Sequence, residues 1–334
     1  NFLTENGIAV VAEDHMGHGK SIEGGSKQGY FQGGWYTAVD DSYKLLKDTQ
    51  AKFPGVPYIL LGHSMGSFMA RTILCKYPDS GIAGAIISGT GWQPTFAMPM
   101  MVKLMESICK KGDETAPNEK LQKMIFGGYN GRIKNARTGC DWLTRDESIV
   151  DAYVSHPLCG FTPSSGLFRD MMVGIHYIQQ PGNMAAMKKD LPVHFVAGKE
   201  DPVGSYGKGV EQACAVFKKA GMQDVSIKLY NEGRHEMLNE LNKEEVYQDL
   251  LDWIEKNPIT EQGTDATRTI DTGIRCMNWS VLLLHLMGED LIGDEDARTI
   301  LGSLAEQCEN MRLRYIGKYD LSNWGVLQTT GICA

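Results

Sequence analysis

Short apolar runs alternate with longer amphipathic stretches along the first 258 residues, and this alternation limits the possible folds more than any other feature of the sequence. The apolar runs, which predict strands, are Ile8–Ala12, Tyr58–Leu61, Ile82–Ile87, Val193–Ala197 and Val225–Tyr230. The stretches between them predict helices over Trp35–Phe53, Phe68–Tyr77, Gly209–Ala220 and Glu244–Ile254. Strands that are apolar nearly throughout are covered on both faces. We therefore expect an α/β fold with a mostly parallel sheet flanked by helices.

The alternation is interrupted between residues 93 and 185, where the pattern is mostly helical. An insertion of this length between two strands predicts a helical cap over the C-terminal edge of the sheet, where ligands bind in such folds. The start of the insertion is rich in methionine, with Met98, Met100, Met101 and Met105. Methionine adapts to irregular apolar shapes, so core filling and substrate contact both remain open. Met98 and Met101 are the candidates for substrate contact.

The sequence changes in character after residue 258, because strands are no longer predicted and two helical patterns follow. We expect residues 259–263 to be a linker and residues 264–334 to be an extra α-helical segment. The chain before the linker divides into the first part of the α/β core, the cap insertion and the second part of the core, over residues 1–92, 93–185 and 186–258.

Composition and charge exclude several classes of protein. Hydrophobic residues make up 42% and charged residues 22% of the 334-residue chain, as in folded rather than disordered proteins. The net charge of −8 argues against a nucleic-acid partner. No run of about 18 apolar residues is present, so no transmembrane helix is expected. The eight cysteines form no CxxC pair, which favours free thiols and a cytoplasmic location over disulfides or a metal site.

The pentapeptide from Gly62 to Gly66 has the sequence GHSMG, follows the second apolar run and opens a predicted helix. A serine at such a strand-to-helix turn is held on a strained backbone, and the flanking glycines permit close packing. We expect Ser64 to be a nucleophile and the backbone N–H of Met65 to donate to an oxyanion. The alternative is a glycine-rich turn with a solvent-exposed serine. His63 is expected to pack under the turn or to contact a substrate.

A serine hydroxyl becomes a good nucleophile when a base removes its proton, and two later loops carry residues for this task. His235 follows the last predicted strand, and we expect it to accept the Ser64 proton and to return it to the leaving group. Two carboxylates, Glu200 and Asp201, follow the preceding strand. We expect Asp201 to orient His235, with Glu200 as the alternative. Such a triad needs no metal ion or organic cofactor, and none is expected.

Seven segments resemble the bacterial lysophospholipase and monoacylglycerol lipase-like branch of the α/β hydrolases. They are Glu13–Ser21, Leu61–Ser67, Gly198–Gly204 and Gly233–Glu240 and, within the insertion, Phe126–Asn130, Asp141–Asp146 and His156–Phe161. The resemblance covers roughly residues 1–258 and implies the α/β-hydrolase fold. It also implies hydrolysis of a small carboxylic ester, such as a monoacylglycerol or lysophospholipid, with the acyl chain beneath a mobile cap. The ester is then the expected partner, with at most transient contact between the cap and a membrane surface.

Members of that branch carry an earlier strand and a His-Gly loop whose backbone supplies a second oxyanion donor. This chain begins at Asn1, downstream of that point, so we expect the early strands and the second donor to be missing. Loss of one such donor lowers the rate by about 10²–10³-fold. Three hypotheses follow: an active serine esterase, a catalytically impaired remnant of the same fold, and a same-fold aminopeptidase or thioesterase.

The segment after residue 263 resembles a different family. Thr269–Trp279 and Ser322–Leu327 are similar to the helical N-terminal domain of heparinase II/III-type polysaccharide lyases. In such lyases an asparagine near the place of Asn323 neutralises a uronate carboxylate. Helix packing is the alternative role for Asn323, and none of these patterns predicts the oligomeric state.

Overall fold

The computed structural model describes residues 2–256 and Arg298. The chain divides into two compact units, and the sheet and the predicted catalytic residues lie in the unit formed by Asn1–Leu3, Ala9–Ala51 and Tyr58–Asn257. The other unit comprises Thr4–Ile8, Lys52–Pro57 and Pro258–Ala334. Apart from Arg298, the predicted linker and extra helical segment lie outside the described residues.

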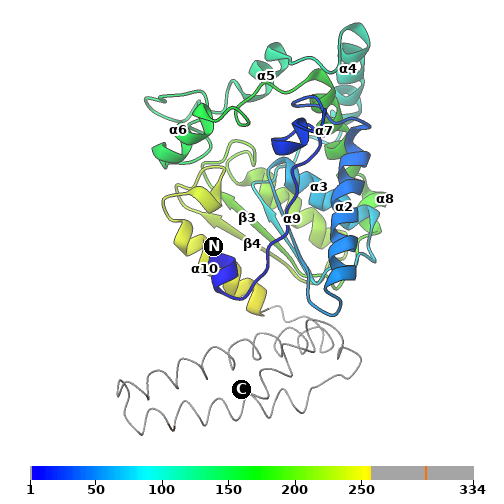
Figure 1. Ribbon diagram of the computed structural model, residues 1–334, viewed down its shortest axis with the longest axis vertical. Helices are drawn as coiled ribbons and strands as arrows, with labels where there is room; N and C mark the ends of the chain where they lie inside the picture. The colour runs from blue at the N-terminus through cyan, green and yellow to red at the C-terminus, as the bar shows by residue number, and fades with distance from the viewer. Residues whose placement is uncertain (1, 257–297, 299–334) are drawn as a thin grey trace. The chain divides into compact units, whose positions relative to one another are not determined.

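Four parallel strands in the order β1-β2-β3-β4 form the sheet of the described chain (Figure 1). They are β1 (Ile59–His63), β2 (Gly84–Ser88), β3 (Val193–Gly198) and β4 (Val225–Tyr230). Every residue of β2 and β3 is buried, as expected for central strands whose sequence is apolar nearly throughout. Four of the five predicted strands are therefore confirmed, and their pairing is parallel as predicted.

Helices cover both faces of this sheet. The described helices are, in chain order, α1 (Phe2–Glu5), η1 (Gly19–Ile22), α2 (Gly34–Lys52), α3 (Met65–Lys76), α4 (Met98–Lys111), α5 (Glu119–Phe126), α6 (Glu147–Ser155), α7 (Ser165–Ile178), α8 (Pro181–Ala185), α9 (Lys208–Lys219), η2 (Met237–Asn239) and α10 (Lys243–Lys256). Side chains of α3 and α9 pack with Ala85, Ile87 and Phe195 on one face. Side chains of α10 pack with Ile86 and Val196 on the other face, because successive strand residues point to opposite sides.

The strand predicted over Ile8–Ala12 is wrong. Residues 9–12 are not part of the described sheet, and the side chains of Val10 and Val11 are 59% and 53% exposed. An apolar run becomes a strand when a neighbouring strand satisfies its backbone hydrogen bonds. In the described sheet the neighbour of β1 is β2, and no ladder reaches residues 9–12. The apolar content of this run predicted a buried strand, but in the described sheet the run has no neighbouring strand and its two valines are exposed.

Between β2 and β3 the chain forms α4 to α8, in the region predicted as a cap insertion. Figure 1 shows α4, α5 and α6 at the top, outside the layers of the sheet and its flanking helices. Met98 and Met105 of α4 are 2% and 0% exposed and belong to the core that α2, α3 and α7 share. The limits 93–185 of a separate cap stay a prediction. None of the helices in the described chain combines the length and apolar content needed to cross a bilayer.

Candidate active site

Ser64 connects β1 to α3 with a left-handed backbone conformation, φ 54° and ψ −121°. Side chains larger than glycine rarely adopt this region, and such strain concentrates at functional sites. The turn is compact because Gly62 lacks a side chain, since a Cβ there would lie 2.3 Å from the carbonyl oxygen of Gly66. The N–H of Ser64 donates to the carbonyl of Ser88 over 3.0 Å, which extends the β1–β2 ladder. The strand–serine–helix turn predicted from the sequence is therefore present.

His235 and Asp201 form a buried pair on the loops that follow β4 and β3. Nδ1 of His235 donates to Oδ2 of Asp201 over 2.9 Å, and the two residues are 2% and 0% exposed. The other carboxylate oxygen of Asp201 accepts from the N–H of Val203 at 2.8 Å. Burial leaves this carboxylate few alternatives to its two donors, so the orientation of the imidazole is well defined. Glu200 is exposed, and the structure brings Asp201 rather than Glu200 to His235.

The carboxyl ends of the four parallel strands bring these residues to one edge of the sheet. Ser64 follows β1, Gly89 follows β2, Asp201 follows β3 and His235 follows β4. The rings of His63 and His235 are 4.7 Å apart between centroids. A Cβ on Gly89, which has φ 58°, would lie 2.9 Å from His63 Cε1 and 3.0 Å from His235 Cε1. Gly89 was not singled out from the sequence, yet its missing side chain allows both imidazoles to approach the edge.

His63 carries no charge beside the serine turn at neutral pH. Burial lowers the pKa of His63 to about 3, and repulsion from His235 adds to this effect. Nδ1 of His63 lies 3.2 Å from the hydroxyl oxygen of Ser88. These contacts fit the packing role expected for His63, and its contact with a substrate stays a prediction.

Sequence reasoning missed a group of aromatic side chains from the insertion that lies beside His235. The ring of Trp142 is 5.0 Å from the ring of His235, and Tyr129 packs edge-on against Trp142 at 4.9 Å. Phe126 stacks on Trp142 at 6.2 Å. Burial raises the pKa of Tyr129 to about 12, with a further contribution from the negative charge of Asp201. The signal for these residues in the sequence was the aromatic content of Phe126–Asn130 and Asp141–Asp146, two of the segments that carry the family resemblance.

Three other predicted site residues lie in and around α3 and α4. Met65 is the first residue of α3, so its N–H lies at the positive end of the helix dipole, next to Ser64. Met98 is buried in the core, and Met101 is half-buried against the same core. A role of Met98 or Met101 in binding a substrate stays a prediction.

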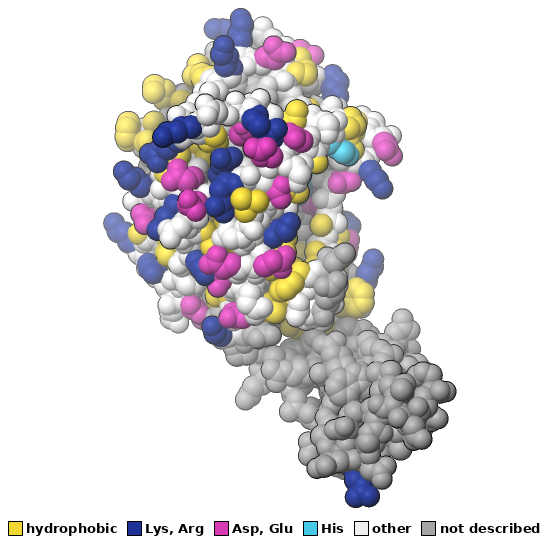
Figure 2. Space-filling view, turned by 90° about the vertical axis from the view of Figure 1, so that its left-hand side faces the viewer, with side chains coloured by type: hydrophobic (Ala, Val, Ile, Leu, Met, Phe, Trp, Pro, Cys, Tyr) yellow, Lys and Arg dark blue, Asp and Glu magenta, His cyan; other side chains and the backbone are white. Residues whose placement is uncertain are grey.

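Positive and negative side chains are mixed on the face of the described residues that Figure 2 shows. Figure 2 shows lysine and arginine side chains interspersed with aspartate and glutamate over the visible face of the described residues. A nucleic-acid site requires a concentrated basic patch, and this face does not carry one. Among the described residues there is no group of three or more His, Cys, Asp or Glu side chains that could hold a metal ion.

Comparison with known proteins agrees with this fold. Monoacylglycerol lipase of Mycolicibacterium smegmatis is 26% identical over 250 residues, which cover 74% of this chain and 78% of that protein. Human monoglyceride lipase is 24% identical over 258 residues, covering 76% of this chain and 75% of the human protein. Among solved structures, a highly thermostable carboxyl esterase from Bacillus coagulans in complex with glycerol matches with a TM-score of 0.70 and 27% identity, covering 76% of this chain and 82% of the esterase.

These matches confirm the predicted α/β-hydrolase fold and the likeness to the monoacylglycerol lipase-like branch. The likeness of the C-terminal segment to heparinase II/III-type lyases stays a prediction, and Thr269–Trp279 and Ser322–Leu327 lie outside the described residues. A model of the family Hydrolase_4, described as serine aminopeptidase, S33, matches residues 1–242. Because this match spans more than half of the 334 residues, the chain belongs to the Hydrolase_4 family.

Proposed function

We propose that this chain is a serine hydrolase that cleaves the carboxylic ester of a monoacylglycerol, a lysophospholipid or a similar small acyl ester. The observation that carries the proposal is the buried His235–Asp201 hydrogen bond of 2.9 Å, at the edge of the sheet where Ser64 forms a strained turn. The names of the relatives, a monoacylglycerol lipase, a monoglyceride lipase and a carboxyl esterase, support the ester class. This combination of nucleophile, base and orienting carboxylate is the arrangement that acyl transfer requires.

In the proposed reaction, Oγ of Ser64 attacks the ester carbonyl carbon while Nε2 of His235 takes the hydroxyl proton. The N–H of Met65 stabilises the negative oxygen of the tetrahedral intermediate. The intermediate expels the alcohol, which takes the proton from His235 and leaves an acyl group on Ser64. Water then attacks the acyl carbonyl while His235 accepts one of its protons. The second tetrahedral intermediate breaks its bond to Oγ of Ser64, which takes the proton back from His235 as the fatty acid is released. Asp201 accepts the hydrogen bond from Nδ1 of His235 and holds the imidazole in the tautomer that these transfers need.

The test is covalent labelling with a fluorophosphonate probe, which reacts with activated serines. The folded wild-type chain is expected to be labelled, and Ser64→Ala is expected to abolish labelling. Ser155→Ala removes an exposed serine at the end of α6 and serves as the matched control, with wild-type labelling expected. A wild-type chain that has a folded circular dichroism spectrum and stays unlabelled would contradict the proposal. That result would favour the catalytically impaired remnant.

A same-fold aminopeptidase is the second candidate, because the description of the family names that activity. The two candidates share the nucleophile, so labelling does not separate them. Turnover of p-nitrophenyl acyl esters should exceed turnover of aminoacyl p-nitroanilides if the ester proposal holds. The reverse order would establish the aminopeptidase.

A further inference from the structure

The loop that carries His235 is bound to one short segment of the insertion. We call residues 231–242, between β4 and α10, the histidine loop, and residues 141–145 the tether. Four consecutive carbonyl groups of the tether each accept a hydrogen bond from the histidine loop. The distances are 2.6 Å from Arg234 Nη1 to Asp141 O, 3.3 Å from His235 N to Trp142 O, 2.7 Å from Glu236 N to Leu143 O and 2.9 Å from Arg234 Nη1 to Thr144 O.

Glu240 lies at the centre of this contact and is 0% exposed. Oε1 of Glu240 accepts from the backbone N–H of Arg234 at 2.9 Å and of Arg145 at 3.1 Å. Oε2 accepts from Nε of Arg145 at 2.8 Å and from the N–H of Leu241 at 2.9 Å. A buried carboxylate is tolerated when donors surround it, and here the donors come from both the tether and the histidine loop. Glu240 therefore joins two segments that are almost 100 residues apart in the chain.

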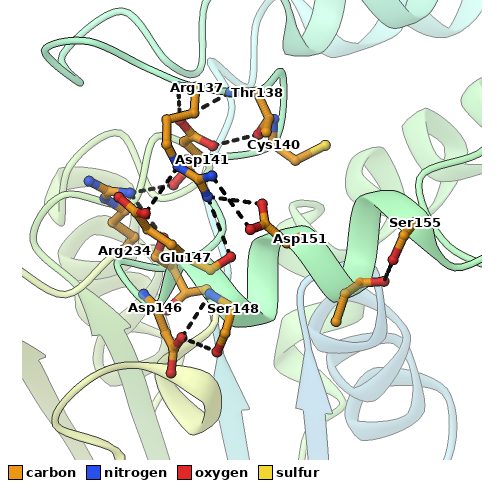
Figure 3. Close-up of polar contacts among 12 residues, drawn as sticks. Arg137, Thr138, Cys140, Asp141, Asp146, Glu147, Ser148, Asp151, Ser155 and Arg234 are labelled. Atoms are coloured by element: carbon orange, nitrogen blue, oxygen red, sulfur yellow. Dashed lines mark hydrogen bonds and ion pairs between the residues drawn. The ribbon is translucent and has the colours of Figure 1, made fainter.

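The end of the tether at residue 141 is held by hydrogen bonds from residues 137 and 138. Figure 3 shows the carboxylate of Asp141 accepting from the backbone of Arg137 and Thr138, while the side chain of Arg234 reaches the Asp141 carbonyl. Arg137 also pairs with Asp151 of α6 over 3.0 Å. Because the tether is fixed at this end as well, a displacement of the histidine loop would break several hydrogen bonds together.

We propose that Glu240 is a positioning residue for catalysis: it clamps the histidine loop to the tether and so holds the ring of His235 between Asp201 and Trp142. The N–H that Glu240 binds belongs to Arg234, the residue directly before His235, so the clamp acts one residue from the base. This inference rests on the proposed function, since it assigns a role in the reaction that His235 would serve. It accounts for a fully buried carboxylate that the proposed reaction itself does not use.

Two glutamates contact the same arginine and provide a matched pair of variants. Arg145 binds the buried Glu240, and its Nη1 lies 3.5 Å from Oε2 of Glu232, whose side chain is 83% exposed. Glu240→Gln keeps the volume but replaces one acceptor oxygen by an NH₂ group that faces N–H donors. Glu232→Gln removes a screened surface pair and leaves the clamp intact.

The experiment measures kcat and KM of the full chain on p-nitrophenyl butyrate, together with the circular dichroism spectrum and the melting temperature of each variant. Glu240→Gln is expected to lower kcat by about 10–100-fold with KM within about twofold, because a base displaced by a fraction of an ångström still allows binding. Glu232→Gln is expected to change both constants by less than about twofold. A purely structural role would lower the melting temperature without this selective loss of kcat.

The outcomes separate the two proposals. If the wild type turns over the ester and folded Glu240→Gln keeps its kcat within about twofold, the positioning role is refuted while the proposed function stands. If the folded wild type neither turns over the ester nor reacts with the fluorophosphonate, the proposed function fails and the positioning role fails with it. If Glu240→Gln does not fold, Arg145→Lys decides, because it keeps the charge but loses the guanidinium hydrogen bonds. A lower kcat at unchanged KM in that variant supports the clamp, and an unchanged kcat overturns it.

Discussion

Gly62 and Gly66 flank Ser64 in the same pentapeptide, yet their surroundings in the structure are opposite. A Cβ on Gly62 would lie 2.3 Å from the carbonyl oxygen of Gly66 and 2.7 Å from Cβ of Ala70. A Cβ on Gly66 would have no atom within 4 Å. Ordinary contact begins at 3.4 Å, so Gly62→Ala requires β1 and α3 to separate by about 1 Å, whereas Gly66→Ala requires no movement.

The expected size of the effect follows from this shift. Overpacking of a tight contact destabilises by about 1–3 kcal/mol, which corresponds to a melting temperature lower by about 2–12 °C for a domain of this size. The atoms that must move include the backbone on both sides of Ser64, and a misplacement of about 1 Å lowers the rate of a positioned group by about 10²-fold. Gly66→Ala lies in α3 and is expected to hold or raise the melting temperature, since alanine favours a helix by up to about 1 kcal/mol over glycine.

The assay combines thermal unfolding with the rate of fluorophosphonate labelling at 25 °C, where both variants are expected to be folded and circular dichroism checks that they are. Gly62→Ala should show the lower melting temperature and a labelling rate reduced by about 10²-fold relative to wild type. The decisive comparison is between the two variants, because they add the same methyl group two residues from the nucleophile. Equal melting temperatures for Gly62→Ala and Gly66→Ala would refute the packing argument, and wild-type labelling of Gly62→Ala would refute its link to Ser64.

Three further predictions concern other parts of the described chain. Asp201→Asn should lower kcat for a p-nitrophenyl ester on the order of 10⁴-fold while Glu200→Gln stays within about twofold, and equal losses would contradict the assignment of the buried carboxylate. Burial lowers the pKa of His194 from 6.5 to about 4, so the unfolded chain binds more protons in that window and stability falls as the pH decreases through it. Between about pH 4 and 6.5, His194→Gln should reduce the slope of the unfolding free energy against pH, measured in urea, by up to about 1.4 kcal/mol per pH unit. An unchanged slope would contradict the lowered pKa of His194. Burial raises the pKa of Cys75 to about 12. Iodoacetamide at pH 8 should therefore modify the half-buried Cys140 before the buried Cys75, as peptide mapping by mass spectrometry would show. Equal rates of modification at the two cysteines would contradict the burial of Cys75.

The parts of the molecule that were predictable from sequence are those set by local pattern. The turn at Ser64 needs a strand end, small flanking residues and a helix start, and all three are adjacent in the chain. The loops of Asp201 and His235 were predictable because parallel strands place their carboxyl ends at a common edge. The choice of Asp201 over Glu200 also depends on which side chain is buried, and the structure supplies that burial.

The contacts between the tether and the histidine loop were not predictable. Most of their acceptors are backbone carbonyls, which every residue possesses, so no residue type marks them in the sequence. Glutamate and arginine are mostly exposed in proteins, so the burial of Glu240 against Arg145 depends on how the insertion folds onto the loop. The failed strand at Ile8–Ala12 has a related cause, because strand formation depends on a neighbour rather than on the run itself.

The placement of the insertion between two adjacent strands also shapes the order of folding. Paired residues of β1 and β2, such as Ile59 and Gly84, are 25 residues apart, whereas Ala85 and Val193 of β2 and β3 are 108 apart. Closing the longer loop costs about 1.3 kcal/mol more in chain entropy. We therefore expect the β1–β2 and β3–β4 pairs to form as separate halves and to join late. Until they join, the apolar edges of β2 and β3 are open to other chains, which makes this interval the stage most prone to aggregation.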